Sequence, residues 1–259
     1  MADRDKIVEF CNDYLKVKEI HDYGRNSMQV EGKPEVNKIA LGVSANLELF
    51  EKAAEWGADM VIVHHGLFWQ KDTINQKTGD FDFSITDLMK KRVETLMKNG
   101  MSMLAYHHSL DMHPVIGNQA QFFLKASLRY KGDFGSYNKQ KFGLYGDTKI
   151  MREELIKRIN DVFGTNARVY GDGPEEIKRI GFVSGYGIFA LEEAADLGCD
   201  TFVTGSADES DISLAKEAKI NLILPGHYNS EKLGIQALGE LVKNKFRIEV
   251  RFIDVPCEV

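Results

Sequence analysis

The 259-residue sequence has few cysteines, no long apolar run and no excess of positive charge. Its three cysteines, Cys11, Cys199 and Cys257, show no metal-binding spacing and cannot all pair with one another, so we expect a reducing, cytoplasmic setting. No stretch approaches the roughly 20 apolar residues that span a bilayer, and the polar start lacks the apolar core of a signal peptide. The net charge of −6 gives no electrostatic reason to expect nucleic acid as a partner.

The composition and the apolar pattern of the sequence indicate a globular α/β protein. Apolar residues make up 43% and charged residues 28% of the chain, which is enough for one large or two small domains with real cores. Apolar runs alternate with helical periodicity, as in βαβ units with a parallel sheet. The predicted strands are residues 39–43, 60–63 and 101–105, and the predicted helices are residues 7–17, 47–56, 84–99, 117–129 and 149–163.

The second half of the sequence repeats part of the first. Residues 51–59 (EKAAEWGAD) match residues 192–200 (EEAADLGCD) without a gap. Other residues of the two halves match at a shorter offset, so the first copy carries an insertion, most simply at residues 70–82. We therefore predict an α/β fold of two similar, interlinked modules with largely parallel sheets. These modules are residues 1–129 and 149–259, and a linker rich in Gly, Lys, Asn and Tyr joins them at residues 130–148.

Five of the seven histidines lie at the ends of three apolar runs, residues 60–63, 101–106 and 220–225, and the ends of strands are where α/β sheets place their sites. A carboxylate follows a histidine by four residues in two of these clusters. Neutral imidazoles and carboxylates are the ligands that divalent transition metals prefer. The sequence therefore predicts a metal centre. Its candidate residues are His64, His65, His107, His108, Asp111, His227 and Glu231.

Two of these pairs restrict the geometry of such a centre. Successive side chains of a strand point to opposite faces, so His64 and His65 bind one metal only if the following glycine bends the chain. Otherwise two neighbouring metals take one imidazole each. His227 and Glu231 share one face if a helix begins near Asn229. A carboxylate in that place can bridge two ions, which lower the pKa of a shared water and make it a nucleophile near neutral pH.

Longer motifs around these residues resemble the NGG-interacting-factor-three-like family, whose members are often labelled GTP cyclohydrolase I type 2 homologues. The motifs occur in family order and cover nearly the whole chain. Two positions depart from the family pattern: Gly66 stands where proline usually follows the double histidine, and Ser206 stands where an acidic residue is common. The matching stretches are residues 26–32 (NSMQVEG), 63–69 (VHHGLFW), 106–114 (YHHSLDMHP), 203–205 (VTG) and 226–231 (GHYNSE).

The resemblance implies a two-metal site at the junction of the two α/β modules. By position in the motifs, the implied ligands of the two divalent ions are His64, His65, Asp111, His227 and Glu231, with Glu231 as the bridge. It also implies that His107 carries a proton or contacts the substrate, and that the chain forms a homo-oligomer, typically a ring-shaped hexamer. The ligand types suit zinc, iron, manganese, nickel or cobalt.

We expect a metal-dependent hydrolase that acts on a purine nucleotide or a related phosphorylated small molecule, with His107 and Glu231 as catalytic residues. The GTP cyclohydrolase label rests on analogy with the family. The alternative is a non-catalytic metal-binding scaffold, or a metal storage or delivery protein, with a protein partner. Metal exchange separates the two hypotheses, because a scaffold keeps its ions tightly whereas a catalytic site keeps an open coordination position.

Overall fold

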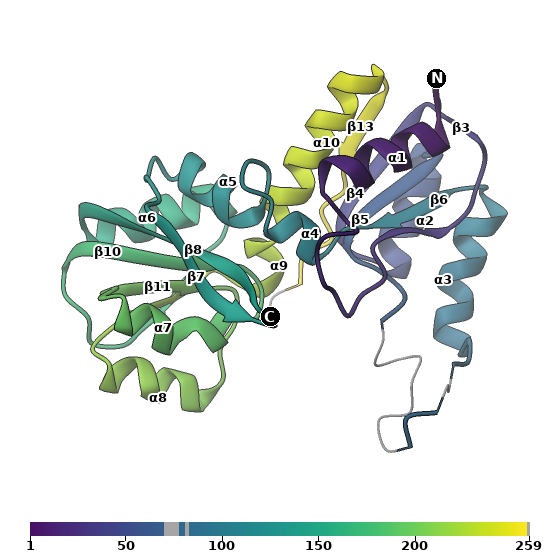
Figure 1. Ribbon diagram of the computed structural model, residues 1–259. Helices are drawn as coiled ribbons and strands as arrows, with labels where there is room; N and C mark the ends of the chain where they lie inside the picture. The colour runs from purple at the N-terminus through teal and green to yellow at the C-terminus, as the bar shows by residue number, and fades with distance from the viewer. Residues whose placement is uncertain (70–77, 81–82, 258–259) are drawn as a thin grey trace. The chain divides into compact units, whose positions relative to one another are not determined.

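The computed structural model describes residues 1–69, 78–80 and 83–257, which form two compact units (Figure 1). Unit 1 comprises residues 1–110 and 235–255, and unit 2 comprises residues 111–234 and those after 255. The chain enters unit 2 at the end of α4 (His108–Asp111) and returns to unit 1 within α10 (Lys232–Phe246). Most of the predicted insertion at residues 70–82 lies outside the described residues.

Unit 1 is built on a five-stranded sheet in the order β13-β4-β5-β6-β2. The three inner parallel strands, β4, β5 and β6, are almost continuously buried, as expected when helices cover both faces, whereas the edge strand β13 is exposed or half-buried. Adjacent residues of β4 show the two faces, because Leu41 lies against Gly239 of α10 and Gly42 lies against Leu49 of α2. The parallel strands are β13 (Glu249–Phe252), β4 (Lys38–Ser44), β5 (Met60–His65) and β6 (Ser102–Ala105), and β2 (Ser27–Val30) pairs antiparallel with β6.

The helices of unit 1 follow the sequence pattern closely. The helix predicted at residues 47–56 is α2 (Leu47–Trp56), which begins where the side chain of Asn46 accepts a hydrogen bond from Leu49 N. It ends at Gly57, whose φ of +77° is the left-handed conformation that glycine adopts without strain. The other elements are α1 (Arg4–Tyr14), α3 (Asp87–Lys98) and a two-stranded ribbon of β1 (Ala2–Asp3) and β3 (Glu35–Val36).

Unit 2 is built on a six-stranded mixed sheet in the order β7-β8-β10-β11-β12-β9. Two hydrophobic cores cover its faces, since Phe182 of β10 belongs to one and the next residue, Val183, belongs to the other. The strands are β7 (Gly132–Tyr137), β8 (Gln140–Met151), β9 (Arg168–Tyr170), β10 (Glu176–Val183), β11 (Thr201–Thr204) and β12 (Asn221–Leu224), and the last three are parallel. The helices are α5 (Asn118–Lys125), α6 (Arg152–Phe163), α7 (Leu191–Asp196), α8 (Glu209–Glu217) and α9 (His227–Ser230).

The segment at residues 130–148 is not the expected linker, because it contains β7 and most of β8. Buried Phe134 and Phe142 anchor this hairpin in one core, and the residues at its turn, Asn138 and Lys139, have positive φ. Its many glycines and polar residues hide the strand pattern in the sequence. The helix predicted from residue 149 begins at 152, because β8 continues through buried Ile150. The boundaries of units 1 and 2 therefore differ from the predicted module boundaries.

The repeated sequence is also a repeated structure. In both copies a strand, a helix and a parallel strand follow one another, as β4-α2-β5 and as β10-α7-β11. Oδ2 of Asp59 accepts hydrogen bonds from the backbone N–H groups of residues 37 and 38, at 2.8 and 3.2 Å. Oδ2 of Asp200 accepts from those of residues 178 and 179, at 2.7 and 3.3 Å. The two matched aspartates thus hold the start of the first strand in the same way in both units.

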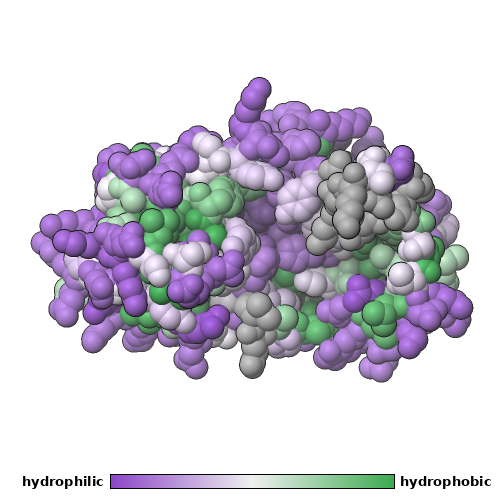
Figure 2. Space-filling view, turned by 90° about the horizontal axis from the view of Figure 1, so that it is seen from below, coloured by the Kyte–Doolittle hydropathy of each residue, from purple (hydrophilic) through white to green (hydrophobic). Residues whose placement is uncertain are grey.

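Figure 2 shows hydrophilic residues over most of the visible face, with smaller apolar patches among them. Within the part of the chain that the structure describes, every helix is too short or too polar to cross a bilayer.

Candidate metal centre

Three histidines of unit 1 come together at the carboxyl ends of two parallel strands. His64 and His65 end β5, His107 follows β6, and one ring nitrogen of each lies within 4.8 Å of those of the others. The ring centroids of His64 and His107 are 5.0 Å apart, and those of the neighbours His64 and His65 are 4.8 Å apart. The alternation of side chains along β5 therefore does not separate the two rings at the end of the strand.

The hydrogen bonds of His64 select the atom that it can offer to a metal. Its Nδ1 lies 2.9 Å from the backbone carbonyl oxygen of Tyr106. A carbonyl oxygen only accepts, so Nδ1 carries the hydrogen and the lone pair of the neutral ring is on Nε2. A backbone partner of this kind commonly fixes the tautomer of a metal-binding histidine. Nδ1 of His65 lies 3.1 Å from the hydroxyl of Ser44, which can donate or accept and so leaves both tautomers of His65 open.

Asp22 is a residue of this site that the sequence analysis missed. Its carboxylate accepts hydrogen bonds from Gly24 N, Asn26 Nδ2 and His108 N, each at 2.9 Å, and from Nδ1 of His107 at 3.0 Å. Burial raises the pKa of Asp22, but the hydrogen bond and the charge of His107 outweigh it, so this pKa lies well below its usual range. Four donors already surround the carboxylate, and it is thus better suited to orient His107 than to bind a metal.

The hydrogen bond of His107 selects its tautomer. Because Nδ1 donates to the carboxylate of Asp22, the lone pair of the neutral ring is on Nε2. The rings of Tyr23 and Trp69 meet the His107 ring edge to face, with centroids 5.4 and 5.1 Å away. The neighbouring His108 likewise donates from Nδ1, in its case to the carbonyl oxygen of His21 at 3.2 Å.

Unit 2 holds the other predicted ligands. Asp111 is buried, and its Oδ1 accepts from Asn118 Nδ2 at 2.8 Å and from Ser184 Oγ at 3.0 Å. Nε2 of His227 lies 3.3 Å from Oε2 of buried Glu231. The expected helix begins at His227 itself, as the short α9, and not near residue 229. His227 and Glu231 are therefore neighbours, as the spacing predicts.

Two small residues shape the surroundings of His227. Gly185 has a φ of +62°, and a Cβ atom there would collide with Oε1 of Glu231 and lie 3.2 Å from Nε2 of His227. A side chain at this position would fill the space next to both ligand atoms. Ser206 places its Oγ 3.4 Å from Nδ1 of His227, so a hydroxyl group lies beside this ring nitrogen.

Comparison with known proteins identifies the family of the chain. The model of the Duf34/NIF3 (NGG1p interacting factor 3) family matches residues 2–257. The chain belongs to this family. A protein named GTP cyclohydrolase 1 type 2 homolog from Archaeoglobus fulgidus is 37% identical over 251 residues, 97% of each chain. A protein of the same name from Pyrococcus horikoshii is 36% identical over 260 residues, 98% of each chain.

Solved structures agree with this assignment to the NIF3 family. The structure of protein ybgI, described as of unknown function, has a TM-score of 0.90 and 31% identity over the whole of both chains. A crystal structure of a protein from Thermus thermophilus has a TM-score of 0.85 and 30% identity, also over the whole of both chains. These similarities confirm the mixed α/β fold that the sequence predicts.

The donor groups of this NIF3-family protein fit divalent transition metals. Unit 1 offers buried or half-buried imidazoles with directed lone pairs, and unit 2 offers an imidazole with two buried carboxylates. Such mixed nitrogen and oxygen sets are typical of zinc, iron and manganese sites. The implied ligands fall into these two groups: His64 and His65 in unit 1, and Asp111, His227 and Glu231 in unit 2.

Proposed function

We propose that this NIF3-family protein is a hydrolase that binds two divalent metal ions and acts on a purine nucleotide or a related phosphorylated small molecule. The observation that carries the proposal is the group of three imidazoles at the ends of β5 and β6, in which one ring nitrogen of each lies within 4.8 Å of the others. We assign His64 and His65 to the ions and His107 to the acid–base role beside them. The ions would be held by His64 and His65 together with Asp111, His227 and Glu231, with Glu231 as the bridge. Its relatives' name, GTP cyclohydrolase 1 type 2 homolog, supports the substrate class.

Bound divalent ions would polarise the substrate and make water a nucleophile near neutral pH. The chain itself supplies the acid–base group, which we assign to His107. Asp22 holds the hydrogen of the ring on Nδ1, so Nε2 is the atom that takes a proton from water or returns it to the leaving group. Trp69 and Tyr23 restrict the rotation of this ring by edge-to-face contacts, and the proton acceptor thus keeps its orientation.

Metal content and turnover of GTP test the proposal together. We expect about two ions per chain by elemental mass spectrometry of protein purified without chelator, and turnover of GTP by the loaded protein. Glu231→Gln should lower the metal content and the rate, whereas Glu240→Gln, at an exposed position of α10, should change neither. His107→Gln should keep the metals and lower the rate roughly 100-fold or more, the typical contribution of a general acid–base group.

Each alternative result has a defined meaning. Trace metal that does not rise after reloading with zinc, manganese or ferrous iron would contradict the metal centre itself. A full metal content without turnover of nucleotides or phosphoesters would favour the non-catalytic scaffold or the metal delivery protein. We further propose that the protein forms a homo-oligomer, a hexamer by resemblance to its family, which sedimentation of the loaded protein measures directly.

A further inference from the structure

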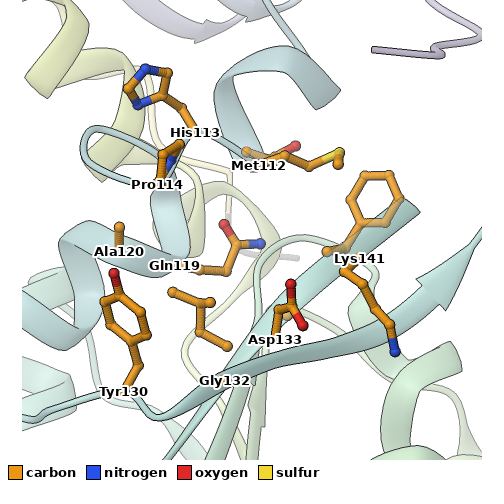
Figure 3. A pocket seen from close by; sticks show the side chains of 13 residues that line it. Met112, His113, Pro114, Gln119, Ala120, Tyr130, Gly132, Asp133 and Lys141 are labelled. Atoms are coloured by element: carbon orange, nitrogen blue, oxygen red, sulfur yellow. The ribbon is translucent and has the colours of Figure 1, made fainter. Parts of the chain in front are cut away.

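Unit 2 contains a cavity of about 340 Å³ that no step of the proposed chemistry uses (Figure 3). This volume lies in the range of small-molecule sites, roughly 300–1,000 Å³. Most of its lining is apolar or aromatic, and a few polar side chains reach it. The lining residues that matter below are Asp111, Met112, Gln119, Tyr130, Asp133 and Phe142.

Gln119 is the polar group of greatest interest in this cavity. It is 2% exposed and lines the cavity together with Tyr130 and Asp133 (Figure 3). Its Oε1 is buried and accepts no hydrogen bond from any residue that the structure describes. Buried carbonyl oxygens nearly always have a donor, from the protein, from water or from a ligand.

A chain of hydrogen bonds fixes which end of the Gln119 amide is left over. The carboxylate of Asp111 only accepts hydrogen bonds. The hydroxyl of Ser184 therefore donates its single hydrogen to Oδ1 of Asp111, at 3.0 Å. The oxygen of Ser184 must then accept from Nε2 of Gln119, at 3.2 Å. Oε1 of Gln119 is therefore the remaining atom, and it requires a donor. A ligand that completes this network has to present an N–H or O–H group.

The other walls restrict the ligand further. Tyr130 and Phe142 offer aromatic rings and Met112 offers a thioether, which favour a flat, apolar molecule. The charges on the walls are the carboxylates of Asp111 and Asp133 and the ammonium of Lys141, and Lys141 is already paired with Glu193 at 2.6 Å. Two carboxylates and a single, already paired ammonium group disfavour the binding of a phosphate or carboxylate inside the cavity. The walls thus fit a neutral planar heterocycle.

We propose that this cavity binds the heterocyclic base of the substrate and that Oε1 of Gln119 accepts a hydrogen bond from an N–H group of that base. The identity of the ligand as a substrate rests on the proposed function, but its binding does not require the metal ions. The same hydrogen-bond chain connects the base to Asp111, one of the proposed metal ligands. Gln119 and Tyr130 are in this view the residues that select the base.

Calorimetric titration of nucleosides into the full-length, metal-free protein tests the inference. Guanosine carries N–H donors on its base, whereas purine riboside has none, and neither carries a phosphate. We expect guanosine to bind at least tenfold more tightly than purine riboside. Gln119→Met should weaken guanosine binding at least tenfold and leave purine riboside nearly unchanged. Tyr130→Ala, at a position 50% exposed, should weaken both nucleosides, whereas Leu124→Ala, at an exposed position of the same helix as Gln119, should affect neither.

The results separate this inference from the proposed function. Turnover of GTP by the loaded protein without nucleoside binding to the metal-free protein would overturn the cavity as a base site and leave the hydrolase intact. Guanosine binding that depends on Gln119, without any turnover, would support the cavity and contradict the hydrolase. If circular dichroism shows that Gln119→Met fails to fold, the test rests on Tyr130→Ala. Unchanged binding of both nucleosides to Tyr130→Ala would overturn the inference.

Discussion

Nδ1 of His107 lies 3.0 Å from Oδ1 of Asp22, which precedes it in the chain by 85 residues. Asp22 belongs to the loop before β2, and His107 follows β6, the strand with which β2 pairs. The hydrogen bonds of Asp22 therefore join the loop before β2 to the residues after β6 and fix the orientation of the His107 ring.

The first prediction concerns the tautomer of His107. In the metal-free protein, long-range proton–nitrogen NMR spectra should show the hydrogen on Nδ1. Asp22→Asn should produce a mixture of tautomers, because a carboxamide can donate as well as accept. Asp13→Asn, on the exposed side of α1, should leave the spectrum unchanged. A wild-type ring with its hydrogen on Nε2 would contradict the assignment of Nε2 as the proton acceptor.

The second prediction concerns Gly185. Gly185→Ala puts a methyl group against Glu231 and His227, whereas Gly164→Ala adds one in open space at nearly the same φ, +64°. Gly164→Ala should cost only the backbone strain, roughly 1–2 kcal/mol of unfolding free energy. Gly185→Ala should cost more in chemical denaturation and should also lower the metal content per chain. Equal losses with unchanged metal content would show that Gly185 does not shape the site.

Acid should weaken the fold through Asp147. Hydrogen bonds from Arg179 and Lys131 lower the pKa of Asp147 to about 2, compared with roughly 3.9 in an unfolded chain. A lowered pKa contributes stability that is present above about pH 4 and is lost as the pH falls toward 2. The urea midpoint of Asp147→Asn should therefore lie below that of the wild type at about pH 6, and the difference should shrink as the pH falls from about 4 toward 2.

A measurement at high salt is the control for the comparison of the wild type with Asp147→Asn. Because Asp147 is exposed, about 1 M sodium chloride should reduce the difference near neutral pH. Asp161→Asn, at another exposed carboxylate, should not reproduce the pH dependence. A difference that persists in strong acid would mean that Asp147 acts through packing and not through its charge.

The matched aspartates give a fourth prediction. Asp59→Ala and Asp200→Ala each remove an acceptor of two backbone N–H groups. Hydrogen bonds to a charged group contribute about 1.5–3 kcal/mol, so both variants should lose unfolding free energy of this order. Amide hydrogen exchange should rise mainly in β4 and β5 for Asp59→Ala and mainly in β10 and β11 for Asp200→Ala. Increased exchange in the opposite unit only would contradict the equivalence of the two copies.

The sequence predicts best where local signals and tertiary structure agree. α2 has apolar periodicity, a capping asparagine and a terminal glycine, and its predicted bounds are confirmed. The histidine clusters could be found because parallel strands end at one edge, so residues after different strands of a sheet become neighbours. The individual residues that we propose as ligands come from the resemblance to the family motifs.

The failures of the sequence analysis have physical reasons too. No local pattern marks Asp22, since its partners are brought to it by the pairing of β2 with β6. The hairpin at residues 132–151 lacks a continuous alternation because glycines replace side chains where Phe134 and Val183 approach the backbone. Gln119 and Gly185 are ordinary in sequence and become notable only through the atoms around them.

The path of the chain between the two units has a consequence for biosynthesis. β13, which follows all of the unit 2 helices and strands, pairs with β4 and closes one edge of the unit 1 sheet. During translation, β5 and β6, which position the three histidines, emerge early, yet this edge of β4 stays unpaired until residues 249–252 have left the ribosome. An unpaired strand edge is prone to association with other chains. The nascent chain therefore passes through a long interval before the sheet is complete. In this interval, chaperones that cover the open edge, or metal ions that bind early, can determine whether the chain folds or associates with other chains.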